Sequence, residues 1–188
     1  MKKILMSLGM LSILTTNTFG NTFGALTYGK SSSGQTINNN SNQNINFDNV
    51  KSYKMNLGSV ALPIEGDLET EGVKKENNFD FYFGLGISAG DKKDYIYQSE
   101  SIELNYTSYI FNIGKAFALN NYIILLGGVG IEHTRVSDNR EIGEALFQKN
   151  KFNLNGGVLM FLYKSNLGIQ IDYDSAPKNI NIGLAYRF

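Results

Sequence analysis

His133 is the only histidine of the chain, and histidine is the side chain best suited to proton transfer near neutral pH. A catalytic triad would need a serine within hydrogen-bond reach of this imidazole and a carboxylate behind it. The hydroxyl and carboxyl side chains that follow it are Thr134, Ser137, Asp138, Glu141 and Glu144. Arg135 stands two residues after the histidine, where a close His-x-Ser pair would need its serine. A lone histidine also excludes a two-histidine metal site, so we predict no catalytic, metal-binding or cofactor-binding residue.

Several charged residues fall on the small-residue face of the strands that the sequence predicts. These residues are Lys54, Asp80, Glu132, Asp172 and Arg187. Buried charges are stable only when they are paired or hydrogen-bonded, so we interpret the five as a polar network inside the protein. The alternative interpretation is a path for protons or ions.

The composition limits the function further. The chain has 17 basic and 17 acidic residues, so no strong overall field favours nucleic acid as a partner. It has no cysteine, which excludes disulfides, cysteine-ligated zinc, iron–sulfur clusters and thiol catalysis. With 188 residues it is long enough for one domain, and its 20 glycines with only 2 prolines fit strands and turns.

The N-terminus has the layout of an export signal. Met1-Lys2-Lys3 is basic, the run from Ile4 to Leu14 is apolar, and Thr18-Phe19-Gly20 offers small residues for cleavage. The apolar run is far shorter than the roughly 20 residues that a membrane-spanning helix needs. We therefore predict a signal peptide over residues 1–20 and one domain over residues 21–188.

The domain is dominated by alternation of apolar residues with small or polar ones, the period of a β-strand. The clearest rows cover residues 79–89, 109–117, 122–135, 152–162, 167–173 and 180–188, with further strands expected at 22–30 and 52–62. Pairing Leu162 with Leu167, and Tyr173 with Ile180, aligns three apolar rows. A three-residue turn after Ala118 would place it opposite Tyr122. The Asn-rich segment 31–46 is predicted to be a disordered outer loop.

The sequence also indicates which face of the strands points outward. Glycine, asparagine, serine and aspartate on the second face suit a narrow lumen filled by side chains, and tyrosine and phenylalanine cluster at the ends of the apolar rows. Lys115 is the charged exception on the apolar face, close enough to a turn to reach the interface. We predict an all-β fold: an antiparallel up-and-down transmembrane β-barrel of eight strands. A second count gives residues 95–106 a strand of their own and leaves 21–50 as a tail.

The last strand resembles the C-terminal strand of bacterial outer-membrane β-barrels, which closes with alternating apolar residues and a terminal phenylalanine. The matching residues are Ile182, Leu184, Tyr186 and Phe188. The resemblance is to the small barrels of the OmpA, OmpX and opacity-protein type, and the Asn-rich N-terminal third departs from it. It implies that this row is the assembly signal read by the barrel-assembly machinery.

The same resemblance implies a monomer in the bacterial outer membrane, in contact with lipid and lipopolysaccharide. It also implies a structural or surface-interaction role, in which the loops 31–46, 90–104 and 137–150 contact host cells, phage or lipopolysaccharide, and not a general porin. His133 and Arg135 would then face outward at the rim, with Arg135 pairing with lipid phosphate. One alternative is a lipid A-modifying enzyme, although Arg135 replaces the serine of the deacylase motif. Another is a soluble periplasmic carrier of the lipocalin kind, with the apolar rows inside.

Overall fold

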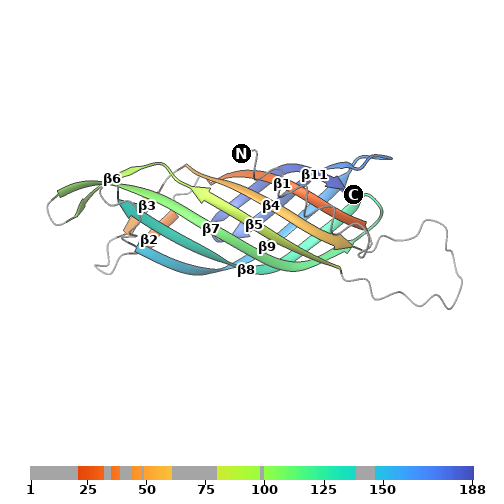
Figure 1. The fold of residues 1–188 in the computed structure, drawn as a ribbon, viewed down its shortest axis with the longest axis horizontal. Coiled ribbons are helices and arrows are strands. Elements are labelled where there is room, and N and C mark those ends of the chain that lie inside the picture. The colour runs from red at the N-terminus through yellow and green to blue at the C-terminus, as the bar shows by residue number, and fades with distance from the viewer. Residues whose placement is uncertain are drawn as a thin grey trace, which may run out of the picture.

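The computed structural model describes residues 21–31, 35–38, 44–47, 49–60, 80–97, 100–138 and 147–188, and every regular element among them is a β-strand (Figure 1). The strands are β1 (Asn21–Ser31), β2 (Gln35–Asn38), β3 (Asn44–Phe47), β4 (Val50–Val60), β5 (Phe81–Ala89), β6 (Lys93–Tyr97), β7 (Glu100–Ala118), β8 (Ile123–Asp138), β9 (Phe147–Phe161), β10 (Leu167–Ser175) and β11 (Lys178–Arg187). These segments contain no helix with the length and apolarity needed to cross a membrane. The predicted signal peptide lies outside the described residues.

Eight of the strands close into an antiparallel barrel in which each strand pairs with its neighbours along the chain. The circle β1-β4-β5-β7-β8-β9-β10-β11 is closed by pairing of β1 with β11, from Phe23 opposite Arg187 to Gly29 opposite Asn181. The predicted eight-stranded barrel is therefore confirmed. The second count is wrong, because residues 21–31 form a barrel strand and β7 runs without interruption from Glu100 to Ala118.

The apolar rows face outward. Leu26 is 61% exposed, Phe117 60% and Leu184 73%, whereas Lys54, Asn112 and Asp172 on the opposite face are at most 2% exposed. Successive side chains of a strand point to opposite faces, so the apolar rows form most of the outer surface while the polar residues of the alternate rows enter the lumen. The soluble-carrier alternative, which needs the apolar rows inside, is wrong.

The predicted register is confirmed in two hairpins and wrong in a third. Met160 lies opposite Ile169, and Tyr173 lies opposite Ile180, as expected. Phe117, however, lies opposite Leu125, two positions from the expected Ile123. The Asn120 side-chain oxygen accepts hydrogen bonds from the backbone N–H groups of residues 122 and 123, at 2.8 and 2.9 Å, which makes the turn longer. A shift of two keeps every side chain on its face, so alternation cannot detect it.

The Asn-rich segment is not wholly irregular. Strands β2 and β3 pair from Gln35 opposite Phe47 to Asn38 opposite Asn44. Ile45 and Phe47 are buried in an apolar cluster that we call the upper core, which comprises Ile45, Phe47, Val50, Ile102, Leu104, Tyr106 and Val136. The prediction of a disordered loop is therefore wrong for residues 35–38 and 44–46, because two apolar residues at the strand period anchor this hairpin. Residues 32–34 and 39–43 lie outside the described residues.

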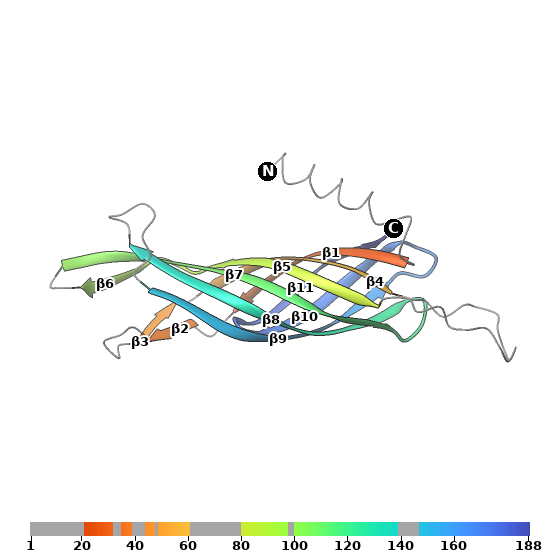
Figure 2. The same ribbon diagram turned by 60° about the horizontal axis from the view of Figure 1, so that its bottom comes forward.

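The strands differ greatly in length. β7, β8 and β9 have 19, 16 and 15 residues, whereas β10 and β11 have 9 and 10. The long strands continue past the closed barrel and, with β6, form a sheet that we call the sheet extension: β6 and the parts of β7–β9 in residues 100–106, 133–138 and 147–153. It lies at the end of the molecule that carries β2 and β3, here called the loop end (Figure 2). The C-terminus lies at the opposite end, here called the termini end.

Closure and register at the seam can be tested together, because the chain has no native cysteine. Leu26 and Leu184 are directly opposite. We expect the Leu26→Cys/Leu184→Cys variant to form a disulfide on oxidation, since opposite Cα atoms are about 4.5–5.5 Å apart. The displaced pair Leu26→Cys/Ile182→Cys serves as the control. Equal cross-linking of both pairs, measured by mobility on non-reducing gels, would contradict the register.

Candidate functional site

A cluster of three charged side chains occupies the lumen. Lys54 Nζ on β4 lies 2.6 Å from Asp172 Oδ1 and 2.8 Å from Asp174 Oδ2, both on β10. All three side chains have 0% exposed area. They meet because Lys54 alternates with outward Tyr53 and Met55, and the two aspartates alternate with outward Ile171 and Tyr173. We call Lys54, Asp172 and Asp174 the ion cluster.

Neutral amide groups complete the surroundings of both carboxylates. Asp172 accepts hydrogen bonds from the side chains of Asn56 at 3.3 Å, Gln170 at 2.7 Å and Asn181 at 2.9 Å. Asp174 accepts them from Asn112 at 2.8 Å, Asn153 at 2.8 Å, Asn155 at 3.0 Å and Asn181 at 3.0 Å. Each carboxylate oxygen thus accepts at least two N–H groups.

The formal charge of the cluster is −1, from one lysine and two aspartates. Side-chain amides from β4, β7, β9, β10 and β11 point their N–H groups at this excess negative charge and reduce the free-energy cost of burying it. Because both carboxylates are fully engaged by described side chains, the arrangement suits a scaffold that ties five strands across the lumen. Among the described residues, no group of three or more histidines or acids could hold a metal ion.

Apolar layers lie on both sides of the ion cluster. The upper core covers the loop end, and a second layer, which we call the lower core, covers the termini end. The buried residues of the lower core are Phe23, Ala25, Val60, Tyr82, Ala116, Ile124, Leu126, Leu159, Phe161 and Ala185. The Tyr82 hydroxyl donates a hydrogen bond to Asn155 and so links the lower core to the amides around Asp174. Side chains therefore fill the narrow barrel, as expected for eight strands.

The structure brings together two of the five charged residues predicted for the lumen, Lys54 and Asp172. Glu132 is buried elsewhere on β8, where its Oε1 accepts a hydrogen bond from the Tyr106 hydroxyl at 3.0 Å. Arg187 lies at the termini end, donates to the backbone oxygen of residue 121 at 2.6 Å and stacks over Phe161. Asp80 is half-buried, just before β5.

Sequence reasoning missed Asp174, because the predicted apolar row ended at residue 173 and the next one began at residue 180. The strand β10 continues to Ser175, so Asp174 has the same inward direction as Asp172 two residues before it. The turn is shorter than expected, and Ser175 pairs with Lys178. The sequence pattern could have predicted this position, because continuing the two-residue alternation of β10 by one more step places Asp174 on the same face as Asp172.

The predicted rim residues lie on the outward face of β8, where both are half-buried. His133 lies opposite Tyr109 and Asn150, and its Nδ1 is 2.7 Å from Asn150 Oδ1. The partner of the imidazole on this side is therefore an amide, whereas a hydrolytic triad needs a carboxylate there. Arg135 lies opposite Thr107 and Gln148.

Removing the only cation of the ion cluster should be costly. Lys54→Met leaves two buried carboxylates facing each other, and we expect the free energy of unfolding to fall by about 3–5 kcal/mol. Asp172→Asn leaves one lysine with one aspartate, so its loss should be smaller. Urea unfolding of the refolded barrel in lipid vesicles measures both. The exposed Lys149→Met is the matched control, with an expected change within about 0.5 kcal/mol. A Lys54→Met barrel as stable as the parent would contradict the proposed role of the cluster.

Comparison with solved structures finds the same fold in bacterial outer-membrane proteins. Ail, the attachment invasion locus protein of Yersinia pestis, solved with the heparin analogue sucrose octasulfate, is 14% identical at a TM-score of 0.57, over 91% of this chain and 100% of that chain. A second Ail structure is 16% identical at 0.54, with the same coverage. No protein-family model matches, and no curated protein is similar in sequence. The protein is therefore a transmembrane β-barrel with the fold of the small, eight-stranded outer-membrane barrels.

Proposed function

We propose that the protein is a surface-interaction barrel of the bacterial outer membrane. The closed barrel is the anchor, and the sheet extension carries the contact surface. The observation that supports this most directly is the continuation of β7, β8 and β9, paired with β6, beyond the closed barrel (Figure 2). A barrel that only anchors itself needs strands of about 9–11 residues. The additional residues of β7, β8 and β9 are therefore not needed to anchor the barrel.

The proposed orientation rests on two of the three connections at the termini end. There β7 joins β8 through residues 119–122, and β9 joins β10 through residues 162–166, whereas β4 joins β5 through the longer segment 61–80. Outer-membrane barrels keep short turns in the periplasm and place longer segments outside. The sheet extension therefore faces the exterior under this proposal. An N-terminal signal peptide, recognition of the row Ile182, Leu184, Tyr186 and Phe188 by the assembly machinery, and a monomeric state belong to the same proposal.

The sheet extension has one packed face and one open edge. Its inward side chains Leu104, Tyr106 and Val136 belong to the upper core, beneath the β2–β3 hairpin. Over residues 147–153, β9 pairs with β8, and no other described strand pairs with its second edge. A free strand edge offers backbone donors and acceptors to a partner. Lys149 and Lys151 on this edge add positive charge.

These basic groups indicate an anionic partner. Lys149 and Lys151 share one face of β9, since they pair with the inward residues Thr134 and Glu132, and Lys149 is exposed while Lys151 is half-buried. Arg135 on β8 is half-buried on the other face of the same sheet. Sulfate and carboxylate groups bind such side chains through charge-assisted hydrogen bonds. The complex of Ail with a heparin analogue supports sulfated carbohydrate as the class of partner. The contact residues proposed for this chain rest on its own sheet extension.

Reversing charge at the edge of β9 should weaken binding of a sulfated polysaccharide. For Lys149→Glu/Lys151→Glu we expect heparin affinity to fall by at least about tenfold, roughly 1.4 kcal/mol. Binding by the parent protein should also weaken as salt is added. Surface plasmon resonance with the refolded barrel measures both. The control Lys115→Glu/Lys164→Glu makes the same change in net charge at the termini end. An equal loss of heparin affinity in this control would contradict the assignment of the binding site to β9.

We expect no enzymatic modification of lipid A by this protein. The His133 imidazole contacts the Asn150 amide at 2.7 Å, and among the described residues no serine or carboxylate is hydrogen-bonded to it. Lipid A from cells that produce the parent protein, His133→Ala or no barrel should therefore have the same masses by mass spectrometry. A lipid A species made by the parent and lost in His133→Ala would establish the enzyme instead.

A further inference from the structure

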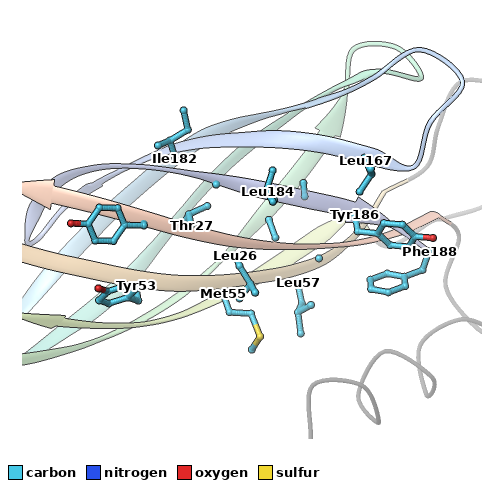
Figure 3. A pocket seen from close by; sticks show the side chains of 15 residues that line it. Leu26, Thr27, Tyr53, Met55, Leu57, Leu167, Ile182, Leu184, Tyr186 and Phe188 are labelled. Atoms are coloured by element: carbon cyan, nitrogen blue, oxygen red, sulfur yellow. The ribbon is translucent and has the colours of Figure 1, made fainter. Parts of the chain in front are cut away.

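An apolar groove runs along the outer surface at the seam where the barrel closes. It has a volume of about 680 Å³ and is lined by outward side chains of β1, β4 and β11 (Figure 3). Leu26, Leu57 and Leu184 form its walls, with Phe188 at one end. Gly24 lies between Leu57 and Tyr186 on the outward row of β1 and leaves the hollow open. The groove belongs to the lipid-facing surface of the barrel.

Aromatic pairs bound the groove at both ends. Tyr28 and Tyr53 lie opposite each other toward the loop end, with ring centroids 5.1 Å apart. Tyr186 and Phe188 meet edge to face toward the termini end, at 5.2 Å. From Gly24 to Tyr28 the strand advances about 13 Å, at about 3.3 Å per residue. Tyrosines at the edge of an apolar belt mark the membrane interface. The groove thus extends from this interface into the hydrocarbon region.

Two lysines stand directly beyond the tyrosine pair. Lys30 follows Tyr28 by two residues on the outward row of β1, and Lys51 precedes Tyr53 by two on β4. They lie opposite each other in the register, and both are exposed. Like charges directly opposite on neighbouring strands destabilise a sheet. No described carboxylate forms an ion pair with either lysine, and Lys51 faces Ala89 on its other side.

We propose that this seam is a lipid A site, with one acyl chain in the groove and a phosphate between Lys30 and Lys51. A phosphate removes the repulsion of the two ammonium groups through charge-assisted hydrogen bonds. The acyl chain covers the apolar walls beside Leu26 and Leu184. The choice of lipid A rests on the proposed function, because that orientation places the lysines at the outer leaflet. The site lies four strands from β8, on the opposite side of the barrel from His133 and Arg135.

The test uses the full barrel, refolded in detergent and mixed with bisphosphorylated lipid A or with phosphatidylglycerol. Native mass spectrometry measures the fraction of one-to-one complex. We expect Lys30→Glu/Lys51→Glu to weaken lipid A binding by at least about tenfold. Gly24→Leu should weaken it similarly, because its side chain fills the groove, where a Cβ already comes 3.1 Å from Leu57. The control Lys115→Glu/Lys164→Glu, which makes the same change in net charge at the termini end, should stay within about twofold of the parent.

A third variant separates binding from folding. Lys51→Glu places an acid opposite Lys30, so the sheet gains a favourable pair while the phosphate site is lost. We expect this variant to unfold at the same or higher urea concentration and still lose lipid A.

Unchanged lipid A binding by Lys51→Glu and by Gly24→Leu would overturn the proposal, as would equal binding of phosphatidylglycerol by the parent. A heat-dependent gel shift of outer-membrane fractions separates this result from failure of the proposed function. A protein without that shift is not an inserted barrel, which contradicts the proposed function. An inserted barrel that does not bind lipid A contradicts only the proposed lipid A site.

Discussion

The pairing of β1 with β11 is the contact on which the rest of the structure depends. Hydrocarbon offers no hydrogen bonds to backbone groups, so a sheet can cross a membrane only when its first and last strands meet. Here the two strands are 147 or more residues apart along the chain. They join through seven residue pairs, from Phe23 opposite Arg187 to Gly29 opposite Asn181. Once this seam is closed, the outward apolar rows of the barrel face lipid and the inward side chains face a narrow lumen.

Closure creates the need for the ion cluster. The inward face of an eight-stranded barrel is too narrow for water-filled space and too polar to be left unpaired. Lys54 reaches Asp172 and Asp174 across the lumen, and six amide side chains supply the remaining donors to these carboxylates. Apolar layers seal both sides. A network filled in this way leaves Asp172 and Asp174 no free oxygen lone pair for a passing substrate, which supports the proposal that the lumen is structural.

The two proposed contacts lie at different places on the barrel. The sheet extension ends in the edge of β9, which carries Lys149 and Lys151. The seam groove lies over β1, β4 and β11 and ends at Lys30 and Lys51. Both sites combine basic side chains with features of the scaffold: a free strand edge in one case, an outward glycine in the other. A rigid barrel can present both at once because neither requires the lumen to open.

The alternation of the sequence by itself determined the fold class, the face that meets lipid and the register of the hairpins β9–β10 and β10–β11, because these depend on neighbours along the chain. Tertiary structure alone decided the rest. The turn at Asn120 shifts β7 against β8 by two residues without changing any face. Ile45 and Phe47 order a polar segment only because they pack against the other residues of the upper core. Asp174 forms an ion pair with Lys54, which is 120 residues away along the chain. Lys30 lies opposite Lys51 only because β1 pairs with β4. Such contacts arise from long-range pairing, which no local pattern encodes.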